Sequence, residues 1–205
     1  MQGNETDLNA FYRGQVRSLL KSTKRPGVEN LIEFLENSDF YYAPASTIYH
    51  GSFKGGLVQH VLNVYNAIQY EYSGLAETDF NTPEIPEESL IIVSICHDLC
   101  KINTYHEGFR WSKDDNQKWE KIPTYKREPD LPMGHGGKSV YLAQKYIDLT
   151  DQEAQAIFWH MGPYDISNYM TLNELSQTFN DNLLAYLLNK ADMTATYIME
   201  NENYK

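Results

Sequence analysis

Hydrophobic residues recur along most of the chain at the spacing of amphipathic helices. Between Leu8 and Ser22, and again between Val28 and Leu35, apolar positions fall three or four residues apart. Pro26 suits the first turn of the second of these segments, which ends near Asn37. The pattern therefore predicts two helices within residues 1–38, packed on a larger body.

The same helical spacing dominates the rest of the chain. After the break at Gly55-Gly56, an apolar stripe begins at Leu57, and Pro86 opens a helix that continues through a wholly apolar run to His97 and Asp98. Thr150 and Glu153 form a capping-box pattern at the start of a short helix. Further helices are expected after Gly134, over 154–159 and over about 182–200.

Residues 104–130 have a different pattern. Trp111 and Trp119 flank a polar stretch, which indicates two short strands around a turn. Two interpretations are equally consistent with this pattern: a surface hairpin, or a flap whose Trp111 ring stacks on a substrate base. With helices elsewhere, the predicted fold is all-α with a small β-hairpin insertion.

Length and composition fit one globular domain, residues 1–205, with 41% hydrophobic residues. No apolar run is long enough to cross a bilayer, and the N-terminal residues lack the basic and apolar regions of a signal peptide. Cys96 and Cys100 lie one helical turn apart and are expected to be reduced. A cytoplasmic location without membrane association follows as the expectation; the oligomeric state is not predicted.

The formal net charge of −11 makes long nucleic acid an unfavourable partner, because backbone binding needs clustered Lys and Arg. It leaves a small phosphorylated substrate open, since bound cations reverse the local field.

Polar residues with metal-binding side chains occur where helices begin or end. His97-Asp98 follows four consecutive apolar residues, and a buried Asp needs a strong partner. His60 lies on the apolar stripe of its helix, which alone is more typical of a core histidine. The remaining candidates are His135 before a helix, His160 at a helix end, and Asp192 beside the last apolar stripe.

In this order the residues resemble the H…HD…H…H…D pattern of the HD-domain metal-dependent phosphohydrolase superfamily. Residues 55–60 (GGLVQH) and 97–101 (HDLCK) are similar to two of its motifs, and residues 42–45 with His50 look like the segment that precedes the first motif in bacterial HD-domain 3′–5′ exoribonucleases. The resemblance covers about residues 40–200. It implies an HD-domain helical bundle and a phosphohydrolase, a phosphodiesterase or phosphomonoesterase that acts on a nucleotide or short oligonucleotide.

The resemblance also implies residue roles. His60, His97, Asp98 and Asp192 would hold a first divalent ion, and Asp98, His135 and His160 a second, with Asp98 bridging; Mn²⁺, Fe²⁺, Ni²⁺ or Zn²⁺ suit these ligands, with Mg²⁺ as an alternative. Two such ions activate a water for attack on phosphorus. Lys101 would neutralise phosphoryl charge, beside the catalytic Asp98, and His50 is a further substrate-binding candidate. Independently of the resemblance, Lys138 lies at the start of the helix after His135 and is either a second phosphate-binding candidate or a solvated lysine.

Alternatives stay open at this point. A single-metal nucleotidase or nucleoside triphosphate phosphohydrolase would use His135 and His160 as substrate contacts. A non-catalytic nucleotide-sensing HD module would keep the ligands without turnover, and an unrelated helical protein would use the histidines structurally. No Gly-Tyr-Pro motif follows His97-Asp98, so cyclic-di-GMP phosphodiesterase activity of the HD-GYP type is not indicated.

Overall fold

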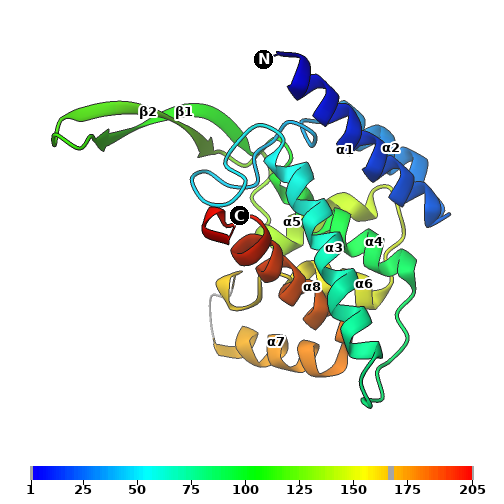
Figure 1. The fold of residues 1–205 in the computed structure, drawn as a ribbon. Coiled ribbons are helices and arrows are strands. Elements are labelled where there is room, and N and C mark those ends of the chain that lie inside the picture. Colours follow the sequence, from blue (N-terminus) through cyan, green and yellow to red (C-terminus); the bar gives the residue numbers. More distant parts are fainter. Residues whose placement is uncertain (1, 166–168, 205) are drawn as a thin grey trace.

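The computed structural model describes residues 2–165 and 169–204, and these residues are mostly helical with one small antiparallel sheet (Figure 1). None of the described helices combines the length and apolar character that a membrane crossing requires. The helices are α1 (Gln2–Ser22), α2 (Val28–Asn37), α3 (Gly56–Ala76), α4 (Glu87–Cys96), α5 (His135–Gln144), α6 (Asp151–Trp159), α7 (Tyr169–Asp181) and α8 (Leu183–Thr194).

One continuous hydrophobic core holds the helices together. The long helix α3 packs against α4 and α8, and α6 contacts α4 and α8 from the other side. Helices α1 and α2 lie along this body and bury their apolar stripes in the same core (Figure 1). Fully buried side chains from both halves of the chain include Leu20, Leu35, Leu57, Ile92 and Leu188.

Several local signals in the sequence act as predicted. Gly55 precedes α3 with a φ of +83°, a conformation that side chains rarely adopt. At α6 the Thr150 hydroxyl accepts from the Glu153 N–H, and the Glu153 carboxylate accepts from the Thr150 N–H, which is the reciprocal capping box. The capping box begins α6 at Asp151, three residues before the predicted start.

Two helical predictions need correction, and one helix was not predicted. The helix expected to continue through His97 and Asp98 ends at Cys96, because Asp98 has φ −108° and ψ 19° and a short 3₁₀ turn, η1 (Leu99–Lys101), follows. The last helix changes at Ala195 into a π-helical turn, Ala195–Met199. Helix α7 was not predicted, although Leu172, Leu175 and Phe179 fall at helical spacing; of its described side chains, only Leu175 is buried.

The predicted hairpin is present. Strands β1 (Tyr105–Lys113) and β2 (Trp119–Arg127) pair antiparallel, with Tyr105 opposite Arg127 and Lys113 opposite Trp119. Figure 1 shows the two strands projecting away from the helical body. The hairpin therefore contributes an arm rather than a layer of the core.

Candidate metal centre

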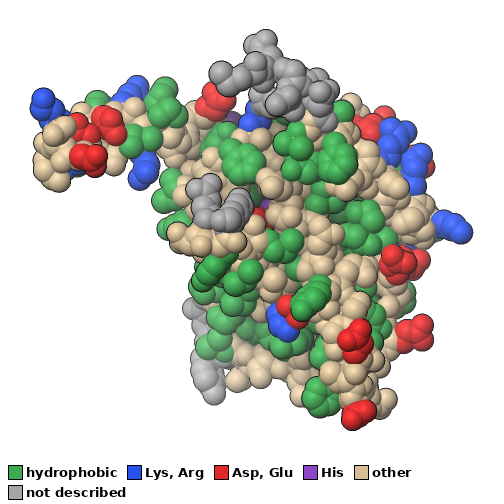
Figure 2. All heavy atoms as spheres, viewed as in Figure 1, with side chains coloured by type: hydrophobic (Ala, Val, Ile, Leu, Met, Phe, Trp, Pro, Cys, Tyr) green, Lys and Arg blue, Asp and Glu red, His purple; other side chains and the backbone are tan. Residues whose placement is uncertain are grey.

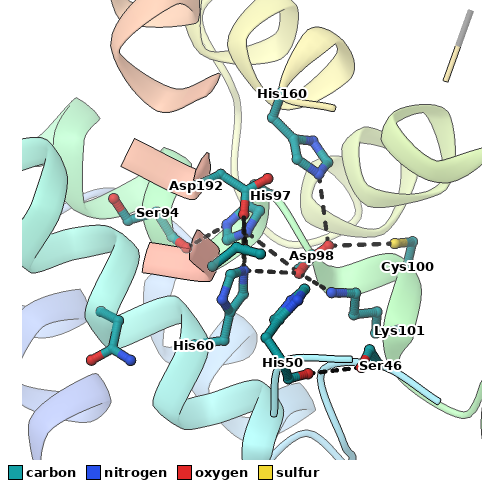
Figure 3. A network of polar contacts seen from close by, with 12 residues as sticks. Ser46, His50, His60, Ser94, His97, Asp98, Cys100, Lys101, His160 and Asp192 are labelled. Carbon is teal, nitrogen blue, oxygen red and sulfur yellow. Dashed lines mark hydrogen bonds and ion pairs between the residues drawn. The ribbon is translucent and has the colours of Figure 1, made fainter. Parts of the chain in front are cut away.

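The six predicted metal ligands meet in the interior of the helical body. They come from the first turns of α3 (His60), the residues just after α4 (His97 and Asp98), the start of α5 (His135), the residue just after α6 (His160) and the last turn of α8 (Asp192). Figure 3 shows five of these side chains pointing toward one another around Asp98. The ends of five helices thus place polar groups at a single point.

The imidazole of His60 is fixed by a carboxylate on its outer side. Its Nδ1 lies 2.9 Å from Oε1 of Glu200, which also accepts from the Asn63 amide at 3.0 Å. A ring whose Nδ1–H donates to a carboxylate presents Nε2 to a metal, and this arrangement is common around metal-bound histidines. His60 Nε2 lies 3.2 Å from Asp192 Oδ1, 3.4 Å from His97 Nε2 and 3.5 Å from Asp98 Oδ2.

Backbone carbonyls orient two further rings in the same way. His97 Nδ1 donates to the Ser94 carbonyl at 2.8 Å, and His160 Nδ1 donates to the Ile157 carbonyl at 2.7 Å. Both rings are fully buried, so their Nε2 atoms face the interior. Among the described residues, His160 Nε2 has no hydrogen-bond partner, although an unpaired buried nitrogen is unfavourable. A bound cation would satisfy it.

Asp98 lies at the centre of the cluster. Its Oδ1 is 2.7 Å from His135 Nε2 and 3.7 Å from His160 Nε2, while its Oδ2 is 2.6 Å from the Lys101 ammonium. Burial alone would raise the pKa of this carboxyl, but the charge of the Lys101 ammonium and the hydrogen bond from His135 Nε2 hold it well below its usual range. Asp98 is therefore an anion with both oxygens available to neighbouring cations.

The histidine pKa values follow from the same contacts. Burial lowers the pKa of His97, whereas the carboxylates of Asp192 and Glu200 outweigh burial at His60 and raise its pKa to about 9. A proton on His60 Nε2 then lies among Asp192, Asp98 and the neutral His97. The space beside His60 Nε2 is thus surrounded by two carboxylates and a neutral imidazole nitrogen, which are groups that stabilise a buried divalent cation.

A glycine allows α5 and α6 to approach closely enough for His135 to join the cluster. A Cβ at Gly136 would lie 2.0 Å from the Phe158 carbonyl oxygen, so no larger residue fits without moving a helix. This contact brings the His135 and His160 rings to 5.2 Å between centroids. Gly136 next to His135 is therefore explained by the close contact between α5 and α6, which leaves no room for a side chain.

Among the described residues, four groups of ligand atoms in and beside the cluster could each hold an ion. Within each group the ligand atoms lie within 4.8 Å of one another; the groups are His50–His60–Glu200, His60–His97–Asp192, His97–Asp98–His160 and Asp98–Cys100–His135. Imidazole and carboxylate donors suit Mn²⁺, Fe²⁺, Ni²⁺ or Zn²⁺. The donor set and the unpaired His160 nitrogen thus fit one or two transition-metal ions.

Sequence reasoning missed Glu200. In a regular helix, the residue that shares the face of Asp192 two turns later is Met199, but the π-helical turn adds one residue and the Glu200 N–H bonds to the Ala195 carbonyl. A spacing rule based on 3.6 residues per turn therefore points to the wrong position. The remaining signal was an acidic residue near the end of the last helix, which is too common to be informative.

Glu200 gives a testable prediction about metal affinity. We expect Glu200→Ala to weaken Mn²⁺ binding by roughly 10- to 100-fold, because the His60 ring loses the carboxylate that orients it. Glu200→Gln keeps an acceptor oxygen and should lose less. Titration of metal-free protein with Mn²⁺ measures the change, and Glu33→Ala on the exposed side of α2 is the control. Equal affinity in Glu200→Ala and the wild-type protein would contradict this role.

His50 lies beside the cluster, as the sequence suggested. Its ring centroid is 5.0 Å from that of His60, and burial lowers its pKa to about 4. His50 and Glu200 also line a cavity of about 880 Å³ that opens next to the cluster. Exposed aromatic side chains form much of its wall, namely Tyr49, Phe53, Tyr164 and Tyr197.

Two other substrate-binding candidates have different surroundings. The Lys138 ammonium is buried and donates to Asp130, Thr104 and the Ile102 carbonyl, which ties α5 to the base of the hairpin. Binding a phosphate would require Lys138 to exchange one of these partners. Trp111 lies on the projecting hairpin and is 67% exposed. Substrate roles for both residues stay predictions.

No protein-family model, curated protein or solved structure matches this chain. The geometry of the cluster is therefore the basis for a functional conclusion.

Proposed function

We propose that this protein is a metal-dependent phosphohydrolase of the HD-domain type, acting on a phosphoester of a nucleotide or short oligonucleotide. The observation that carries the proposal is the convergence of His60, His97, Asp98, His135, His160 and Asp192 on one buried point, with histidine Nε2 atoms facing Asp98. Unrelated structural histidines would have no reason to meet there from five separate elements.

The chain's own residues supply distinct contributions. Glu200 and the Ser94 and Ile157 carbonyls fix the ring orientations before any ligand arrives, which lowers the cost of organising the site. Asp98 provides a carboxylate shared by two groups of ligands, and Lys101 places a cation 2.6 Å from it. When bound, divalent ions would polarise a phosphoryl group and lower the pKa of a water molecule.

The substrate would enter from the aromatic cavity beside His50 and Glu200. Tyrosine and phenylalanine rings on its wall suit a nucleobase, because stacking on aromatic faces tolerates every base. The cavity of about 880 Å³ has room for a nucleotide-sized ligand. These features favour a nucleotide over a small inorganic phosphoester.

A direct experiment tests the proposal. The protein is purified from Mn²⁺-supplemented cells, its metal content is measured by elemental analysis, and it is assayed on p-nitrophenyl phosphate, bis(p-nitrophenyl) phosphate, nucleoside monophosphates and dinucleotides. We expect one or two ions per chain and turnover of at least one ester. Bound metal without turnover would favour the sensing module, and metal-free protein would favour structural histidines.

Metal removal should also change stability. A ligand that binds only the folded chain at 100 times its Kd adds about 2.7 kcal/mol to the free energy of unfolding. We expect Mn²⁺ to raise the Tm and EDTA to lower it to the metal-free value, as measured by differential scanning fluorimetry. A Tm that responds to neither would contradict a site in the core.

A further inference from the structure

The β1–β2 hairpin carries an exposed surface that the proposed metal centre does not use. In the paired register, alternate residues of both strands share one face, which we call the aromatic face. Phe109, Trp111 and Trp119 on this face are 56%, 67% and 65% exposed. Exposed tryptophans on a projecting arm do not contribute to the core, so they point to a binding role. The aromatic face comprises Tyr105, Glu107, Phe109, Trp111, Lys113, Trp119, Lys121, Pro123, Tyr125 and Arg127.

Cations are interleaved with these rings. The Lys121 ammonium lies 4.0 Å from the Phe109 ring centroid, and the Lys113 ammonium lies 5.3 Å from that of Trp119. Residues 105–127 contain six basic and four acidic side chains, a net charge of +2, so the rest of the chain carries −13. Figure 2 shows basic, acidic and hydrophobic side chains along the arm. The hairpin is thus the part of an acidic protein that is suited to an anionic ligand.

The aromatic face leads back to the metal centre. A hollow of about 620 Å³ at the base of the hairpin is lined by Phe109 and Tyr125 on one side and by Ser52 and Phe53 on the other. Ser52 and Phe53 also line the cavity that contains His50 and Glu200. The two hollows therefore lie next to each other, with Ser52 and Phe53 between the hairpin and the proposed catalytic cavity.

We propose that the aromatic face binds a single-stranded nucleic acid of several nucleotides, which continues through the two hollows toward the metal centre. Alternating rings and cations match alternating bases and phosphates, and single-strand binding proteins combine these two elements. Residues two apart on a strand lie about 6.6 Å apart, close to twice the stacking distance, so a base fits between Phe109 and Trp111. A nine-residue strand is roughly 30 Å long, which is more than one nucleotide occupies. Delivery of the strand to the centre rests on the proposed function; binding to the hairpin does not.

Binding is tested on the Mn²⁺-loaded full chain with a fluorescein-labelled 12-nucleotide oligouridylate whose phosphorothioate linkages resist cleavage. We expect Trp111→Ala and Trp119→Ala each to weaken binding about ten-fold, because stacking contributes about 1–3 kcal/mol per base. Lys121→Ala should lower the slope of log Kd against log salt by about 0.7. Lys126→Ala makes the same change of charge on the opposite face and should leave the affinity unchanged.

A second measurement covers the case in which the alanine variants disturb the hairpin. The oligonucleotide should quench the tryptophan fluorescence of the wild-type chain, and Trp111→Phe/Trp119→Phe should bind with little loss while that quenching disappears. The surface is ruled out if the wild-type chain fails to bind at about 100 µM, if Trp111→Ala/Trp119→Ala binds like the wild type, or if Lys121→Ala and Lys126→Ala behave alike.

The two proposals fail separately. Hydrolysis of bis(p-nitrophenyl) phosphate reports on the metal centre without the hairpin. If the protein hydrolyses this ester but does not bind the oligonucleotide, the proposed nucleic-acid binding by the aromatic face is wrong and the proposed phosphohydrolase activity is supported. Oligonucleotide binding that depends on Trp111 and Trp119, without hydrolysis of any ester, would support the surface and overturn the proposed catalysis.

Discussion

Asp98→Asn should reduce turnover by at least about 10³-fold, equivalent to about 4 kcal/mol of transition-state stabilisation. The substitution removes the one carboxylate that belongs to two groups of candidate ligands, while its size and shape are retained. It also leaves the Lys101 ammonium, which lies 2.6 Å from Asp98, without its counter-ion. Steady-state kinetics on the best ester found in the substrate panel measures the loss.

Metal stoichiometry distinguishes a bridging role from an ordinary ligand role. If Asp98 bridges two ions, Asp98→Asn should lose both, whereas Asp192→Asn should lose only the ion held with His60 and His97. The exposed Asp148→Asn is the matched control, and circular dichroism of the metal-free proteins checks folding. Undiminished turnover in a folded Asp98→Asn variant would refute the proposed mechanism.

Arg25→Ala should destabilise the fold by about 3 kcal/mol. The Arg25 guanidinium makes two hydrogen bonds to the Glu153 carboxylate, at 2.8 and 3.0 Å, and the Glu153 side chain is fully buried. Removing one partner of a buried ion pair leaves an uncompensated charge, which costs far more than losing a surface pair. Chemical denaturation at pH 7 measures the change. Arg17→Ala, which breaks the exposed pair with Glu36, should cost less than about 1 kcal/mol.

The pH dependence gives a second test of the same pair. Burial would raise the pKa of Glu153, but hydrogen bonds from Arg25, the Thr150 N–H and Ser89 lower it below its usual value. The ionised Glu153 carboxylate therefore stabilises the fold above about pH 4.3, the pKa of a glutamate in the unfolded chain. This stabilisation is lost as the pH falls through the lower pKa that Glu153 has in the folded chain. Without Arg25, burial dominates and Glu153 takes up a proton at a higher pH. The stability difference between wild type and Arg25→Ala should therefore shrink from pH 7 to pH 4; a constant difference would contradict the assignment.

Periodicity and capping signals in the sequence were sufficient for most helices and for the hairpin. The stripe from Leu57 to Ile68, the Thr150 capping box and the Trp111–Trp119 segment each depend on local chemistry, and the structure has the corresponding elements. Helix α7 has a shorter stripe, Leu172, Leu175 and Phe179, and it buries little because it lies at the edge of the body. Its position depends on tertiary contacts that spacing alone does not reveal.

For the candidate metal centre, the sequence predicted the ligands but not the groups that orient them. The ligands lie at helix ends, where a change of periodicity marks them, and their order along the chain suggested that they converge. The partners that orient them were not predictable. Glu200 depends on a π-helical turn, and the acceptors for His97 and His160 are main-chain carbonyls, which every residue carries. The burial of Lys138 by Asp130 and Thr104 is likewise a long-range contact.

The base of the hairpin has an architectural consequence. The Glu128 N–H bonds to the Thr104 carbonyl at 2.8 Å, so the chain leaves the helical body and returns to it at almost the same point. The Lys138 ammonium holds both sides of this junction. Since the exit and the return are already joined, the helices do not need the arm to close the chain. The reach of the arm can therefore lengthen, shorten or change in composition over evolution while the interior of the bundle stays the same.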